Sequence, residues 1–288
     1  MKLLRFVENG QEQPGILDTK NRIRNLSAII SDFDARTLNQ ADLITRLHAL
    51  EVDSLPLIKT SPRIGSCIEM SGKIICIGYN SHLHTQQMEI KAMQKGEMVV
   101  FLKPTSAAVG PNDPILYGKH TSKLDWEAEL GVVIGKQGKY IDPMQAEDYI
   151  LGYTCINDIS ERYWQFETED KQYTKGKGMD SFAPIGPYLV TKDEITDATN
   201  LNVKLWVNDE LRQDFNTSDY INNPAAVVSY LSQFFTLYPG DIIAMGSAPG
   251  NARFWGEDKY LKPDDKVTFE IEGLGRQQQL VVTEDYPH

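Results

Sequence analysis

The sequence predicts a mostly β protein with α additions. Runs of strand-forming residues recur along the chain, as at 74–78, 98–103 and 203–207, with turn residues between them. Apolar residues at helical spacing are confined to a few short stretches. Many strands with few short helices are typical of a core built on sheets, and 288 residues are enough to bury a large one.

We expect two parts, a small N-terminal α+β domain at residues 1–65 and a larger domain at residues 66–288. In the first part, residues 2–7 and 15–18 are short strand candidates, and Asn39 is the candidate cap of a helix. No residue pattern there carries chemistry. The first part is therefore expected to act as a scaffold or as an oligomer contact.

The larger part supplies most of the expected strands. A helix is expected to begin after Asn223, with Pro224 in its first turn, and to run through Phe235. Asp158 or Ser160 is the candidate cap of a short helix at 161–165. The expected strands are 74–78, 98–103, 124–135, 149–156, 203–207, 210–213, 241–245, 267–271 and 279–282.

Composition and charge exclude several classes of partner. The formal net charge of −11 argues against a nucleic-acid or anionic-membrane partner. It does not exclude small anionic substrates, because a bound divalent cation can reverse the local field. The three cysteines have no paired spacing, and no apolar run reaches the roughly 18 residues of a membrane span. With no signal peptide expected at residues 1–6, we expect a cytoplasmic protein.

Two glutamates in the segment 124–135 (L-D-W-E-A-E-L-G-V-V-I-G) are the first candidate site residues. Alternate residues of a strand point to opposite faces, so Glu127 and Glu129 share a face. Residues two apart on a strand are separated by roughly 6.5–7 Å, so flexible carboxylates can converge on one cation. Oxygen ligands of this kind suit Mg²⁺, Mn²⁺ or Ca²⁺ rather than Zn²⁺. The alternative is a solvated strand face with two acidic residues.

Three further residues have both a functional and a plain interpretation. Asp158 follows a strand and is either a helix cap or a third carboxylate ligand. Lys177 lies in the glycine-rich segment 173–184, which is expected to be a loop. There it either binds an anion or enolate or only keeps the loop soluble. His84 lies in a polar segment, where a histidine is either solvated or catalytic.

Taken together, these segments resemble the fumarylacetoacetate hydrolase family. Three motifs occur in the family's order, with matching positions from about residue 75 to the C-terminus, and residues 1–65 resemble the small N-terminal domain of many members. The motifs are D-W-E-A-E-L at 125–130, N-D-I-S-E-R with Gln165 at 157–165, and K-G-M-D-S-F-A-P-I-G-P at 177–187. The resemblance implies a mixed β-sandwich roll, a homodimer and one divalent metal, Mg²⁺ or Mn²⁺, with Ca²⁺ as a further candidate.

The resemblance also implies a role for each candidate residue. Lys177 would stabilise enolate charge beside the metal, and His84 would activate water on a lid. The metal ligands would be Glu127, Glu129 and Asp158. The substrate would be contacted by Arg162, Gln165 and Ser247, the last replacing the family's usual threonine.

One departure from the family pattern concerns the residue that orients His84. Gln87 stands where the family has a glutamate, and Glu89 lies two residues further on. An amide can hydrogen-bond an imidazole, but it cannot take a proton or raise the basicity of the histidine as a carboxylate does. A weakened relay would cost up to the roughly 10²–10⁴-fold that general-base catalysis contributes.

Three functions remain open from the sequence. The first is a metal-dependent hydrolase that cuts a C–C bond in a β-diketo acid through a metal-bound enolate, with an acylpyruvate or a 2,4-diketo-3-deoxy sugar acid as substrate. The second is a lyase that decarboxylates an oxaloacetate-like β-keto acid through the same enolate. The third is a catalytically impaired relative that binds a keto acid without turnover.

Overall fold

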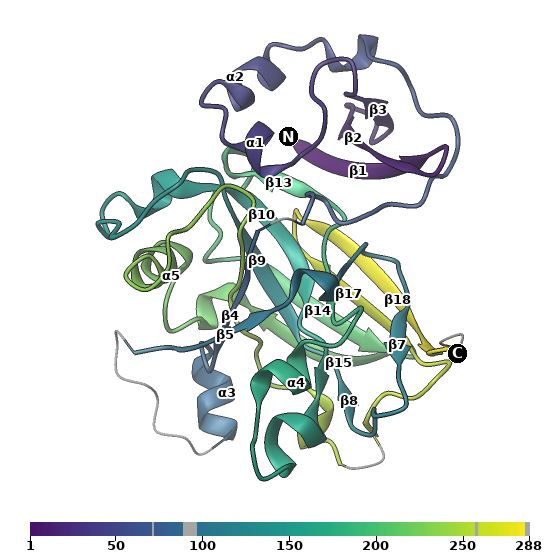
Figure 1. The fold of residues 1–288 in the computed structure, drawn as a ribbon, viewed down its shortest axis with the longest axis vertical. Coiled ribbons are helices and arrows are strands. Elements are labelled where there is room, and N and C mark those ends of the chain that lie inside the picture. Colours follow the sequence, from purple (N-terminus) through teal and green to yellow (C-terminus); the bar gives the residue numbers. More distant parts are fainter. Residues whose placement is uncertain (71, 89–96, 257–258, 286–288) are drawn as a thin grey trace.

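The computed structural model describes residues 1–70, 72–88, 97–256 and 259–285 (Figure 1). In this part of the chain, the strands form a nine-stranded sheet, a five-stranded sheet and two short two-stranded pairs. The helices are few and short. The prediction of a mostly β protein with α additions is therefore confirmed.

The nine-stranded sheet runs through the centre of the molecule. Its strand β9, next to the middle strand β10, is buried at every residue, which explains its continuous apolar sequence after Glu129. Strands β16 and β4 are parallel, and the other neighbours are antiparallel. The strand order is β3 (Ile23–Asn25), β2 (Gln11–Leu17), β1 (Lys2–Glu8), β13 (Leu189–Thr191), β10 (Ile150–Asn157), β9 (Ala128–Ile134), β16 (Ile242–Ala244), β4 (Ile74–Gly78) and β5 (Val99–Lys103).

The five-stranded sheet contacts the first sheet through β9 and β10. Its first hairpin turns at Asn208 and Asp209, whose φ angles of 49° and 68° suit the turns that join twisted strands. The strand order is β15 (Glu210–Asn216), β14 (Asn202–Val207), β17 (Lys266–Ile271), β18 (Gly275–Thr283) and β7 (Ile115–Tyr117). The short pairs are β11 (Ser160–Glu161) with β8 (Leu124–Asp125), and β12 (Ala183–Pro184) with β6 (Ala108–Val109).

The helices cover the ends and edges of the sheets. The α-helices are α1 (Ala35–Leu38), α2 (Leu43–His48), α3 (His82–Gln87), α4 (Tyr173–Lys177) and α5 (Pro224–Leu231), and Tyr163–Glu167 forms a π-helical turn. Single 3₁₀ turns occur at Val52–Ser54, Thr105–Ala107, Ala146–Tyr149, Lys192–Glu194, Thr217–Asp219 and Ala252–Phe254. Among the described residues, no helix has the length and apolar character to cross a membrane.

The cap of α5 is as predicted, but its end is not. The Asn223 side chain accepts a hydrogen bond from the amide of Ala226 at 2.9 Å, and Pro224 occupies the first turn. The helix ends at Leu231, before the predicted end at Phe235. Residues 232–234 continue as turns, the amide of Phe235 still donates to the carbonyl of Leu231 at 2.9 Å, and Phe235 packs against the core.

Three other local predictions are wrong. Asn39 ends α1, and α2 begins after Asp42. Neither Asp158 nor Ser160 caps the π-helical turn, which begins after Arg162 without a side-chain cap; Ser160 lies in β11, and the amide of Trp164 donates to Glu161 at 2.9 Å. Residues 173–177, expected as loop, form α4.

The N-terminal strands are continuous with the large sheet. Strand β1 pairs with β13, and Leu3 and Ile16 belong to the same buried cluster as the strands of the centre. In Figure 1 this part lies at one end of the molecule, with β1 beside β13. The division at residue 65 remains a prediction.

The three cysteines are buried and unpaired. Burial raises the pKa of Cys67 to about 11, and it raises the pKa of Cys76 and Cys155 above the usual range of a thiol. We expect no labelling of the folded protein by a thiol-specific reagent at pH 8, and labelling of all three cysteines in denaturant. Fast labelling of one cysteine in the folded state would contradict its placement in the core.

Candidate metal centre and active site

Three buried carboxylates meet at one end of β9 and β10. Glu129 lies in β9, Glu127 directly precedes this strand, and Asp158 directly follows β10. The antiparallel pairing of the two strands places Asn157 opposite Ala128, and the amide of Asp158 donates to the carbonyl of Glu127 at 2.9 Å. One oxygen from each of the three carboxylates lies within 4.8 Å of the others.

The segment that carries the two glutamates is not the single strand that the sequence predicts. It breaks into β8 and β9 at Trp126 and Glu127. The amide of Glu127 donates to the Asn157 side chain at 3.2 Å instead of entering the sheet. The two glutamates are nevertheless brought together, as the predicted shared face requires.

The three carboxylates fit a divalent cation. Oxygen ligands lie about 2.0–2.6 Å from Mg²⁺ or Ca²⁺, so oxygens up to about 4–5 Å apart can share one ion. Burial, Asp158 and Glu127 all raise the pKa of Glu129, which shows the electrostatic cost of this cluster without a cation. Glu127, Glu129 and Asp158 are therefore the residues that would hold the metal.

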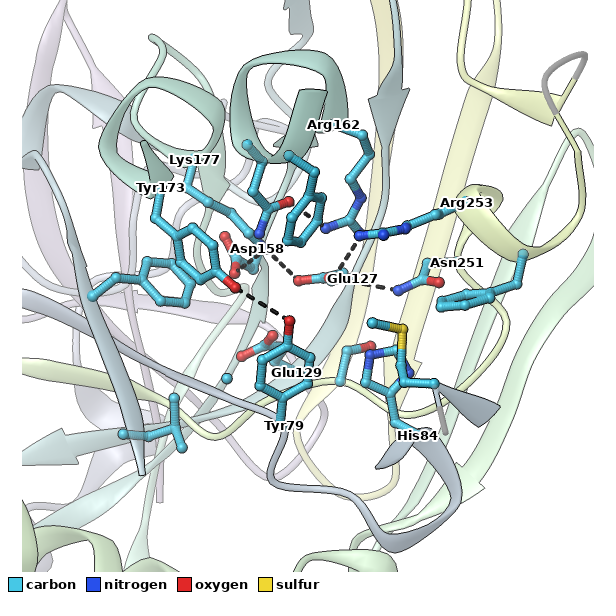
Figure 2. A pocket seen from close by; sticks show the side chains of 18 residues that line it. Tyr79, His84, Glu127, Glu129, Asp158, Arg162, Tyr173, Lys177, Asn251 and Arg253 are labelled. Atoms are coloured by element: carbon cyan, nitrogen blue, oxygen red, sulfur yellow. Dashed lines mark hydrogen bonds and ion pairs between the residues drawn. The ribbon is translucent and has the colours of Figure 1, made fainter. Parts of the chain in front are cut away.

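Lys177, at the end of α4, contacts two carboxylates of this cluster. Its Nζ atom lies 2.7 Å from Asp158 Oδ2 and also contacts Glu127 Oε2 (Figure 2). Burial lowers the pKa of Lys177, but the negative charges of Asp158 and Glu127 raise it by more. The pKa is raised overall, so the ammonium stays charged. Burial raises the pKa of Glu127, but Arg162 and Lys177 bring it below its usual range.

Arg162 connects the cluster to Asp125 and Gln165. Its guanidinium donates to Asp125 Oδ2 at 2.7 Å, to Gln165 Oε1 at 2.8 Å and to Glu127 Oε1 at 2.6 Å. Arg162 and Gln165 are thus fixed beside the metal cluster. Their predicted contact with substrate oxygens stays a prediction.

Lys103 is a second buried lysine that the sequence analysis missed. It ends β5, and its Nζ lies 2.5 Å from Asp158 Oδ1. It also donates to the carbonyl of Ile159 at 3.0 Å and to the carbonyl of Lys177. Lys103 therefore holds a carboxylate of the metal cluster and the end of α4 in place. No local sequence pattern distinguishes it, because its partners lie more than fifty residues away.

Replacing Lys103 with methionine is expected to destabilise the fold by about 3 kcal/mol, because removal of one partner leaves buried charge uncompensated. The free energy of unfolding in urea measures this. Lys175→Met is the control, since Lys175 pairs with Asp170 at the surface and such pairs contribute about 0–1 kcal/mol. Equal stability of the two variants would contradict a structural role for Lys103.

His84 reaches the same cavity from α3. The Ser81 hydroxyl caps this helix and also donates to Asp219. The imidazole is buried and packs between Tyr79 and Phe254, with ring centroids 6.2 and 5.7 Å away, and its Nδ1 atom has no partner among the described residues. Burial lowers the pKa of His84, and the Gln87 side chain offsets part of this shift. Glu89 lies outside the described residues.

Most of these groups line one cavity. It is lined by eight of the nine site residues that the sequence predicts, namely His84, Glu127, Glu129, Asp158, Arg162, Gln165, Lys177 and Ser247, but not by Gln87. The Ser247 hydroxyl accepts a hydrogen bond from Gln213 at 2.8 Å. The sequence analysis missed the lining residues Tyr79, Phe101, Phe166, Tyr173, Asn251, Arg253 and Phe254. These residues come from separate segments and follow no shared pattern.

Comparison with known proteins agrees with this geometry. The family model described as fumarylacetoacetate (FAA) hydrolase C-terminal matches residues 73–282, which include every residue of the cavity. The chain belongs to the fumarylacetoacetate hydrolase family. A "Putative hydrolase" from Burkholderia multivorans is 46% identical over 281 residues, covering 97% of this chain and 98% of its own.

Solved structures of family members share the whole fold. The fumarylacetoacetate hydrolase of Exiguobacterium antarcticum is 30% identical with a TM-score of 0.84. The maleylpyruvate hydrolase of Sphingobium sp. SYK-6, in complex with manganese(II) and pyruvate, is 27% identical with a TM-score of 0.82. The 2-hydroxyhepta-2,4-diene-1,7-dioate isomerase of Mycobacterium marinum is 28% identical with a TM-score of 0.73. Each comparison covers 99% of this chain and 100% of the other.

Proposed function

We propose that this protein is a divalent-metal-dependent hydrolase that cleaves a C–C bond in a β-diketo acid. The observation that carries this proposal is the buried cluster of Glu127, Glu129 and Asp158, which opens into the cavity that His84 and Lys177 also line. The similarity to a maleylpyruvate hydrolase in complex with manganese(II) and pyruvate supports both the metal and an α-keto acid product.

The metal, Mg²⁺ or Mn²⁺ with Ca²⁺ as a further candidate, would act when bound as a Lewis acid on the α-keto-acid oxygens. His84 takes a proton from the water that attacks the distal carbonyl, because its lowered pKa keeps the imidazole neutral near pH 7. Hydroxide adds to this carbonyl, the C–C bond breaks, and the leaving carbon receives the proton.

The other side chains stabilise charge and orient the substrate. The Lys177 ammonium stabilises the negative charge that develops on the leaving fragment. Arg162, Gln165 and Ser247 orient the keto acid, and the rings of Tyr79 and Phe254 around His84 limit the access of further water.

A second candidate function is decarboxylation of an oxaloacetate-like β-keto acid. The presence of Gln87, where the family has a glutamate, favours it, because decarboxylation requires no activated water. A relative that binds a keto acid without turnover is the third candidate. All three would use the same metal cluster; the first two differ in their products, and the third forms none.

Product analysis distinguishes these functions. We expect the protein with Mn²⁺ or Mg²⁺ to convert a β-diketo acid into pyruvate and a second carboxylic acid, and Glu127→Ala to be inactive. Pyruvate with CO₂ would show decarboxylation instead. Metal binding without turnover on β-diketo and β-keto acids would favour the binding protein. Sedimentation under the same conditions tests the proposed homodimer.

A further inference from the structure

We propose that Arg253 forms an anion subsite that binds a second carboxylate of the substrate, at the end remote from the α-keto acid. This inference rests on the proposed function, and it specifies the substrate class as a dianionic keto acid with a hydrocarbon segment between its two acid groups. Nothing in the family motifs of this chain includes position 253.

The backbone at Arg253 is fixed relative to the metal cluster. Arg253 lies in the 3₁₀ turn Ala252–Phe254. The amide of Ala252 donates to Asp125 Oδ1 at 2.6 Å, and the amide of Arg253 donates to Asp125 Oδ2 at 3.3 Å. Asp125 also receives the Arg162 guanidinium. The cluster and the turn therefore share one buried anchor.

The side chain of Arg253 extends into the cavity (Figure 2). Its guanidinium carbon lies 4.0 Å from the centroid of the Phe166 ring. The stacked ring covers one face of the guanidinium and leaves its N–H groups, which lie in the plane, free to donate. A planar carboxylate matches such a pair of donors.

Arg253 differs from the other cationic groups of the cavity in having no acidic partner. Arg162 is paired with Asp125 and Glu127, and Lys177 is paired with Glu127 and Asp158. The Arg253 guanidinium has no carboxylate within ion-pair distance among the residues that the structure describes. It is thus the cavity cation that remains available to a ligand.

The charges around the metal centre suit a dianion. Four carboxylates and three cationic side chains lie together there: Asp125, Glu127, Glu129, Asp158, Lys103, Arg162 and Lys177. With the carboxylates ionised, as metal binding requires, a divalent ion leaves one net positive charge, and Arg253 makes it two. One charge matches the carboxylate of the keto acid, and the other matches a second acid group.

The two aromatic rings next to Arg253 suit a hydrocarbon segment between the two acids, and Asn251 beside them offers one buried Oδ1 acceptor to this part of the cavity. Phe166 stacks under the guanidinium, and Phe254 is the next residue in the chain and packs edge-on against His84. These rings offer no hydrogen-bond acceptor to a polyhydroxylated tail. Between the two substrate types open from the sequence, the subsite thus favours an acylpyruvate with a terminal carboxylate over a 2,4-diketo-3-deoxy sugar acid.

A matched pair of ligands tests this without turnover. Binding of 2-oxohexanoate and 2-oxoadipate to the Mn²⁺-loaded protein is measured by calorimetry, because the two acids have equal chain length and differ in the terminal carboxylate. We expect the wild type to prefer 2-oxoadipate by roughly 10- to 100-fold, as a hydrogen bond between charged groups implies. Arg253→Gln should reduce the ratio to near one, and Arg253→Lys should retain part of it.

Arg276→Gln is the control variant. Arg276 also lies over an aromatic ring, with its guanidinium carbon 5.7 Å from the Trp206 centroid, but it is on β18 and outside the cavity. This variant should keep the wild-type ratio. Equal affinity of the wild type for both acids, binding of neither, or a ratio retained in Arg253→Gln would overturn the subsite.

The same measurements separate this inference from the proposed function. A preference for 2-oxoadipate that depends on Arg253, without hydrolysis of any β-diketo acid, would support the subsite and refute the hydrolase. Hydrolysis of acylpyruvates with and without a terminal carboxylate at equal kcat/KM, unaffected by Arg253→Gln, would support the hydrolase and refute the subsite.

Discussion

Glu127→Gln is expected to lower the affinity for Mn²⁺ by at least about 100-fold and to abolish turnover. Substitution of residues that only support a metal ligand already costs about 10–100-fold, and Glu127 is a candidate ligand itself. Glutamine keeps the shape of the side chain but removes the negative charge that balances the cation, Arg162 and Lys177. Titration of Mn²⁺ by calorimetry measures the loss.

The matched control is Glu167→Gln. Glu167 lies at the surface at the end of the π-helical turn and pairs with Lys123 at 2.7 Å. This substitution removes the same charge outside the cavity, and the Mn²⁺ affinity should stay within about twofold because exposed pairs contribute little. Wild-type Mn²⁺ affinity in Glu127→Gln would show that the metal binds elsewhere.

His84→Asn is expected to lower kcat for hydrolysis by roughly 10²–10⁴-fold, the usual contribution of a general base. Burial lowers the pKa of His84, so the wild-type activity should be lost with falling pH only below the ordinary histidine value of 6.5. Rates at saturating metal across pH 5 to 8 measure this acid limb, which should disappear in the variant.

Gln87→Glu is the companion variant. A carboxylate beside the imidazole favours its protonated form, so the acid limb should move to higher pH. An unchanged pH profile in Gln87→Glu would show that residue 87 does not act on the His84 imidazole. An unchanged kcat in His84→Asn would favour decarboxylation, in which no water has to be activated.

The sequence made the two glutamates candidate ligands through their spacing, and the family resemblance added Asp158 to form the predicted metal cluster. Glu127 and Glu129 are two residues apart at the start of β9, and Asp158 directly follows β10, the strand that pairs with β9. The break at Trp126 was not predictable, because apolar and acidic residues alternate across it as they do in a continuous strand. It depends on Asn157, which takes the Glu127 amide out of the sheet.

The prediction of a loop at residues 173–177 was wrong because glycine occurs both in flexible loops and where two backbones pack closely. Gly176 suggested a flexible loop, but it lies in α4, where an added Cβ atom would meet the backbone of Gln165 and Glu161 at 2.8 Å. The glycine thus permits close packing of α4. Lys103 and Arg253 were missed for another reason, since only the folded chain brings Lys103 to Asp158 and Arg253 to the cavity.

The anchor at Asp125 has a consequence for the diversification of substrate preference. It holds the turn Ala252–Phe254 by two backbone amides, and this bond does not depend on which side chains the turn carries. Mutations within the turn can therefore exchange the side chain that contacts the distant end of a substrate. The position of the metal cluster relative to the reacting end stays the same. Drift or directed evolution at position 253 is a route to new substrates that preserves the chemical step.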